Sequence, residues 1–200
     1  MDEASALRDY GHALAAAGRA EDGMLVCARA AEDLARLAAA GAPDEVVAAL
    51  FTVRAEAAAL AGHAGRHDVR DRLHTAITAD AAFATGPLAL RALGAALHAV
   101  AAARLDGLLS ALRTGAETDP DGAAEAAALA VAVRHRAGGE RELAESCLLR
   151  LHCLLVTGDD AGALEAARLA RGLMPAAPHL VPRFELLLGP LRAAHPGEGW

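Results

Sequence analysis

The chain has 200 residues and a formal net charge of −7, and 54% of its residues are hydrophobic. Alanine and leucine supply 56 and 31 residues, whereas Val, Ile and Thr together supply 18 and aromatic residues only 2%. Alanine and leucine favour helices, and the scarce β-branched and aromatic residues are those that strands favour. The composition therefore excludes an all-β protein and predicts an all-α fold.

The charge balance also limits the possible partners. Nucleic-acid binding needs clustered positive charge, and the overall negative balance of the chain argues against it. Every strong base is arginine, and the absence of Lys, Asn and Gln indicates the codon bias of a high-GC bacterial genome. The longest stretches without Asp, Glu or Arg, such as 92–103, fall short of the roughly 20 residues of a membrane-spanning helix. Because the chain begins with acidic residues and not with a signal sequence, we expect a soluble, cytoplasmic protein without nucleic-acid or membrane partners.

Gly and Pro residues interrupt the chain every fifteen to twenty residues, which predicts short antiparallel helices. The predicted helices are 3–17, 20–40, 44–62, 67–84, 88–103, 105–115, 121–137, 140–157, 160–174 and 179–194. Neither Gly nor Pro marks the boundary near residue 104. We expect a single helical domain over residues 1–194, followed by a flexible C-terminal tail over 195–200.

One pattern recurs in the segments 7–22, 57–68 and 148–175. A helix rich in small and apolar residues reaches a glycine, at Gly18, Gly65 and Gly158, and acidic residues then begin the next helix. Glycine permits the tight turn, an acidic residue suits a helix N-terminus, and small residues let paired helices approach closely. The pattern predicts repeated helix-turn-helix units.

In the last unit, Gly158 as the turn residue is followed by Ala163, Ala170 and Pro175. These residues resemble the tetratricopeptide repeat (TPR), a helix pair of 34 residues with two alanines and a terminal proline at these positions. The segments 1–40 and 141–200 match the repeat better than the middle of the chain does.

The first unit resembles the same repeat at its small positions. Gly11 and Ala30 match them, and Gly23 stands in place of an alanine. The chain departs from the family in having Leu7 and Cys147 where a large aromatic residue opens the first helix. Gly18 and Gly65 are also 47 residues apart, not 34.

The resemblance implies a right-handed α-solenoid of roughly five antiparallel helix pairs. It also implies a non-enzymatic protein–protein interaction module, or scaffold, that binds an amphipathic or peptide segment of another protein in a concave groove. The first helix of each pair would line this groove. The implied contact residues are Arg8, Asp9, His12, Glu56, His63, Leu148, Leu149, His152, Leu155 and Val156. Two alternatives remain open: a nonrepetitive helical bundle, and a last unit whose leucines are simply core.

Other chemistry has weak support in the sequence. No Gly-x-Ser-x-Gly, Walker or dinucleotide motif occurs, and Cys27, Cys147 and Cys153 fit small buried thiols. His63 and His67 have the i, i+4 spacing of a metal pair, but a glycine lies between them. We therefore expect no enzyme activity, no cofactor and no metal. The alternative function is a ligand-responsive or catalytic bundle with His and Cys residues lining an internal pocket.

The last helix carries an apolar stripe with helical period over residues 180–191. Phe184 and Leu188 lie on this stripe, with Arg183, Glu185 and Arg192 outside it. The stripe predicts a helix that caps the array. A homodimer through the C-terminal helix is the alternative.

Overall fold

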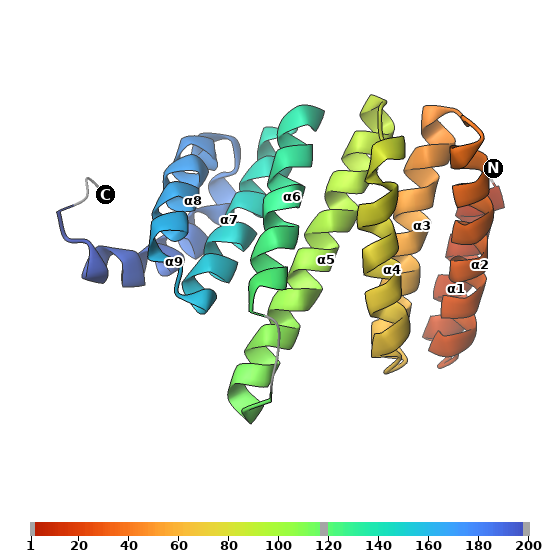
Figure 1. Ribbon diagram of the computed structural model, residues 1–200, viewed down its shortest axis with the longest axis horizontal. Coiled ribbons are helices and arrows are strands. Elements are labelled where there is room, and N and C mark those ends of the chain that lie inside the picture. The colour runs from red at the N-terminus through yellow and green to blue at the C-terminus, as the bar shows by residue number, and fades with distance from the viewer. Residues whose placement is uncertain (1–2, 117–119, 198–200) are drawn as a thin grey trace. The chain divides into compact units, whose positions relative to one another are not determined.

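A computed structural model describes residues 3–116 and 120–197 of the chain. In these ranges every regular element is a helix, which confirms the predicted all-α class (Figure 1). The α-helices are α1 (Glu3–Ala16), α2 (Ala20–Ala39), α3 (Asp44–His63), α4 (His67–Ala79), α5 (Pro87–Thr114), α6 (Asp121–Ala137), α7 (Glu140–Thr157), α8 (Asp160–Leu173) and α9 (Val181–Ala194). Short 3₁₀ helices follow α4 (Asp80–Phe83) and precede α9 (Met174–Ala176 and Pro178–Leu180).

The chain divides into two compact units, residues 1–99 (unit 1) and 100–200 (unit 2). In unit 1, α2 packs against α1 and α3, α3 packs against α4, and α1 also contacts α3. In unit 2, α7 packs between α6 and α8, and α9 contacts both α7 and α8. The single domain expected over residues 1–194 stays a prediction.

Glycine residues with positive φ end the helices at the predicted stops. In the described part of the chain these are Gly18, Gly41, Gly65, Gly115, Gly138 and Gly158, with φ between 70° and 83°. After Gly18 and Gly65, the backbone N–H of Arg19 donates to Leu14 O and that of Arg66 to Ala61 O, both at 2.8 Å. These are the six-residue closures of the Schellman turn, which satisfy carbonyl groups at a helix end.

One predicted helix break was wrong. The predicted helices 88–103 and 105–115 are a single helix, α5. Ala101, Leu105 and Leu108 are all buried, so the apolar face continues at helical spacing through residue 104. Without a helix-breaking residue or a change of buried face, the helix has no reason to end there.

The other ends differ from prediction by short 3₁₀ segments. The predicted helix 67–84 ends as α4 at Ala79 and continues in 3₁₀ form to Phe83. The last helix begins at Val181, not at residue 179. At the predicted tail, the His195 N–H still donates to Leu191 O at 2.8 Å, and residues 198–200 lie outside the described residues.

The backbones of α1 and α2 touch where Gly11 meets Gly23. A Cβ atom on Gly23 would overlap the carbonyl oxygen of Gly11, and one on Gly11 would lie 2.6 Å from the Cys27 sulfur. Both distances are shorter than van der Waals contact, so only glycine fits at this crossing. The alanine of the TPR pattern would not fit at position 23 without moving a helix.

Asp44 at the start of α3 caps the distant N-terminus of α5. Its carboxylate accepts hydrogen bonds from the backbone N–H groups of Leu88 at 2.8 Å and Ala89 at 3.0 Å. A side chain at Gly86 would overlap this carboxylate. Two otherwise unpaired N–H groups of the first helical turn are thus satisfied, and the negative charge suits the positive end of the helix dipole.

We expect Asp44→Ala to lower the free energy of unfolding by about 1–2 kcal/mol, because it removes a cap shared by two N–H groups. Urea denaturation followed by circular dichroism measures this change. Glu45→Ala is the control, since Glu45 is the exposed next residue in the same helical turn. Equal losses in the two variants would contradict the capping role.

The C-terminal helix follows the predicted stripe. Phe184, Leu188 and Leu191 are buried in one cluster with side chains of α7 and α8. Arg183, Glu185 and Arg192 are exposed, and Arg192 Nη1 lies 2.7 Å from Glu185 Oε2. The orientation of the stripe is confirmed, whereas a homodimer through this helix stays a prediction.

Candidate partner-binding face

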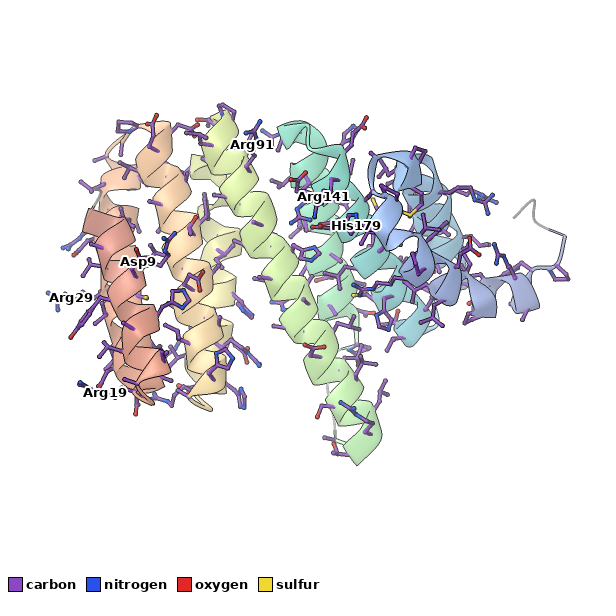
Figure 2. All side chains as sticks on the ribbon, turned by 180° about the vertical axis from the view of Figure 1, so that it is seen from behind. Asp9, Arg19, Arg29, Arg91, Arg141 and His179 are labelled. Atoms are coloured by element: carbon purple, nitrogen blue, oxygen red, sulfur yellow. The ribbon has the colours of Figure 1, made fainter. Side chains whose placement is uncertain are left out.

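In unit 1 the structure brings two of the predicted contact residues together. His12 on α1 and Glu56 on α3 lie within hydrogen-bond distance, with 3.1 Å between Nε2 and Oε2. Both side chains are accessible, with 51% and 32% of their surface exposed. Figure 2 views unit 1 from the side of α1 and α3, where the labelled Asp9 lies on the near surface of α1. We call Arg8, Asp9, His12 and Glu56 the α1/α3 face.

The charges of the α1/α3 face are coupled. Arg8 Nη2 lies 2.8 Å from Asp9 Oδ1, and this hydrogen bond raises the pKa of the Arg8 guanidinium. Cys27 of α2 is fully buried beneath the face. Burial raises the pKa of its thiol, the Glu56 carboxylate adds to this effect, and Arg8 opposes it. Three helices therefore contribute to one electrostatic cluster.

His63 is the exposed last residue of α3. It follows Glu56 by seven residues, which is two helical turns, so it continues the same side of α3. The helix ends immediately after it, because Gly65 adopts a φ of +71° before His67 begins α4. The i, i+4 spacing of the two histidines therefore does not place them on one helical face.

In unit 2, two of the residues predicted to line the groove are buried. Leu148 and Leu149 are only 1% and 4% exposed, and Leu148 packs in the same cluster as Phe184 of α9. Their side chains cannot reach a partner in this fold. For Leu148 the physical reason is the buried cluster that side chains of α7, α8 and α9 form together, whereas Leu149 lies outside that cluster. His152, Leu155 and Val156 remain partly exposed.

His152 lies among charged residues of two other helices. Its pKa is lowered, chiefly by burial and then by the Arg183 guanidinium on α9, while Asp106 on α5 opposes the shift. Lowering the pKa of a histidine below its usual value near 6.5 favours the neutral imidazole at neutral pH. His152 is therefore a neutral hydrogen-bonding group rather than a cation.

The three cysteines are buried, as predicted. Burial raises the pKa of Cys147 and of Cys153 to about 11, so both thiols are protonated at neutral pH and poor nucleophiles. In the described part of the chain, no group of three His, Cys, Asp or Glu side chains is placed to hold a metal ion.

Two shallow depressions lie on the α2 and α4 side of unit 1, which Figure 1 shows in front. Their volumes are about 480 and 420 Å³, and Glu32 and Arg54 line both of them. The remaining lining residues are arginine, alanine, aspartate, valine and leucine. These depressions are thus distinct from a pocket lined by histidine and cysteine.

Sequence reasoning missed two buried arginines that join neighbouring helices. Arg54 Nη1 donates to Ala76 O at 2.9 Å and to Asp80 Oδ2 at 2.7 Å. Arg134 of α6 donates to Glu142 O of α7, and its burial lowers the pKa of the guanidinium. Their positions could have indicated their burial, because each arginine falls on the apolar side of an alanine-rich helix.

No protein-family profile, curated protein or solved structure matches this chain. The TPR resemblance rests on the residues of the chain itself. By length and hydropathy alone, α3 and α5 could each cross a membrane, and half of each apolar stretch is buried within the protein. The cytoplasmic location stays a prediction.

Proposed function

We propose that this chain is a non-enzymatic scaffold, built as a TPR-like right-handed α-solenoid, that binds a segment of another protein on its α1/α3 face. The observation that carries the proposal is the exposed His12–Glu56 pair. It joins the first helices of two successive helix pairs into one accessible surface. In a helical repeat array this surface is the one that receives partner segments.

Repeated helix pairs support the solenoid. Gly18, Gly65, Gly115 and Gly158 end the first helix of successive pairs and are 47, 50 and 43 residues apart. In unit 1 the turns themselves stack, since Arg66 Nη1 at the second turn lies 2.7 Å from Glu21 Oε1 just after the first. The helix pairs are longer than those of the 34-residue repeat, so the array is TPR-like and not a regular TPR array.

The chemistry of the face indicates the chemistry of the partner. Arg8 and His12 offer donors, and Asp9 and Glu56 offer acceptors, all within two adjacent helices. A peptide segment with charges of both signs suits such a surface, because complementary charges set orientation and association rate. In unit 2 the exposed parts of Leu155 and Val156 can contact apolar side chains of a partner.

Site-specific photo-crosslinking in the native host tests this proposal. A photoreactive residue in place of Asp9 should trap a single polypeptide, and His12→Ala combined with it should reduce the yield. The control position is Thr75, an exposed residue of α4 on the other side of unit 1. Equal trapping from both positions would contradict the assigned face.

Native and denaturing mass spectra of the protein from its host then separate the two functions. Extra mass of a polypeptide supports the scaffold. Extra mass of a small molecule or metal, lost on denaturation, would favour the ligand-responsive or catalytic bundle instead.

A further inference from the structure

An exposed ridge runs along the outer surface of α2. It consists of Leu25, Arg29, Asp33 and Leu37, which follow one another at intervals of four residues, and Arg29 and Asp33 also line the larger of the two depressions. Leu25 and Leu37 are 57% and 52% exposed, on the side of α2 opposite its buried residues. Figure 2 shows Arg29 projecting clear of the ribbon at the outer edge of unit 1. We call these four residues the α2 ridge.

The α2 ridge is complementary to a second copy of itself that runs in the opposite direction. Read in the opposite direction it is leucine, aspartate, arginine, leucine. An antiparallel copy centred on Ala31 therefore aligns Leu25 with the other Leu37, and Arg29 with the other Asp33. A second copy of α2 thus meets apolar residues with apolar ones and each charge with its opposite.

The charges of the α2 ridge are available for such a contact. Arg29 has no ion-pair partner among the described side chains of its own chain. Asp33 pairs with Arg36, but both side chains are more than half exposed, so this pair contributes little and leaves the second carboxylate oxygen accessible. Glu32 also lies beside the ridge and adds a second acceptor near the incoming arginine, while Glu21 and Asp22 lie at its N-terminal end.

We propose that the α2 ridge is the interface of a homodimer, in which the α2 helices of two copies pack antiparallel about a twofold axis. A twofold interface uses the same surface on both subunits, and the reversed order of the ridge provides this self-complementarity. A contact between single helices buries less than the roughly 1,200–2,000 Å² of a stable interface, so the dimer forms reversibly at high protein concentration.

Sedimentation equilibrium of the full chain over a series of concentrations up to about 1 mM tests the proposal. The wild type should shift from monomer to dimer. Arg29→Asp should weaken the dimer at least about tenfold, because it sets like charges opposite each other, and Asp33→Arg should do the same. The double variant Arg29→Asp/Asp33→Arg restores opposite charges and should recover most of the affinity. Helical content measured by circular dichroism confirms that each variant is folded.

Matched controls identify the surface. Arg91→Asp reverses another exposed arginine, on α5, and should leave the dimer unchanged. Leu25→Ser should abolish dimer formation, whereas Leu186→Ser, at a 77% exposed position of α9, should not affect it. A chain that stays monomeric, a double variant as weak as the single ones, or loss of the dimer only in Leu186→Ser would each overturn the proposal.

Discussion

Gly23→Ala is expected to destabilise unit 1 by about 1–3 kcal/mol, or more if the helices cannot separate. The added methyl group would overlap the carbonyl oxygen of Gly11. Because that atom belongs to the backbone, no side-chain rotation relieves the overlap, and α1 must shift away from α2. Urea denaturation followed by circular dichroism gives the free energy of unfolding.

Gly62→Ala is the matched control in the same unit. A Cβ atom there meets only the flexible Arg70 side chain, at an ordinary contact distance of 3.8 Å. Replacing a helical glycine by alanine without a clash stabilises by roughly 0.5–1 kcal/mol, so the two variants should change stability in opposite directions. A similar loss in both would show that close helix contact is not the cause.

Arg54→Met is expected to lower the free energy of unfolding by about 3 kcal/mol, near the lower end for breaking a buried ion pair. The Arg54 side chain is only 7% exposed, and its removal leaves Asp80 and the Ala76 carbonyl without their donor. The cost is moderated because 26% of the Asp80 side chain is accessible to water. Thermal and urea denaturation report this change, since Arg54 holds the end of α4 against α3.

Arg72→Met provides the comparison for Arg54. Arg72 lines one of the same depressions and pairs with Asp68 at 3.3 Å, but its side chain is 74% exposed. An exposed pair of this kind contributes at most about 1 kcal/mol. Arg54→Lys should recover part of the lost stability by keeping the charge while losing the two-acceptor geometry. If Arg54→Met and Arg72→Met had equal effects, burial would not explain the role of Arg54.

Local patterns in the sequence predicted most of the helices. Glycine and proline residues marked the ends, and the buried face of α9 followed directly from apolar residues at helical spacing. The same reasoning failed near residue 104, where the expectation of short, evenly sized helices introduced a break. Leu105 and Leu108 continue the buried face of α5, and this continuity should have outweighed the expected length.

The contacts that hold the helices together were not predictable in the same way. Asp44 caps a helix 44 residues further along the chain, and Arg54 reaches Asp80 across 26 residues. The position of Arg54 on the apolar side of α3 indicates burial, but it does not identify Asp80 as the partner. Which partner a charged side chain meets depends on how the helices stack, and that information is not local.

Only part of the candidate face could be predicted, because its contacts also depend on how the helices stack. His12 and Glu56 were both expected to be contact residues, but their pairing follows only from the contact between α1 and α3. Leu148 and Leu149 were misassigned because an apolar surface that binds a partner and one that binds the next helix have the same sequence pattern. Leu148, for example, packs in the same buried cluster as Phe184 of α9.

The buried cysteines of the natural sequence can report how often the helices of each unit separate. Cys27 lies in unit 1, and Cys147 and Cys153 lie in unit 2, with at most 1% of each residue exposed. A thiol reagent can modify them only when the surrounding helices separate, so the modification rate follows the free energy of local opening. Mass spectrometry of the digested chain assigns each modified thiol to its unit. A single experiment can therefore compare how often the two halves of the molecule open, without a probe being introduced.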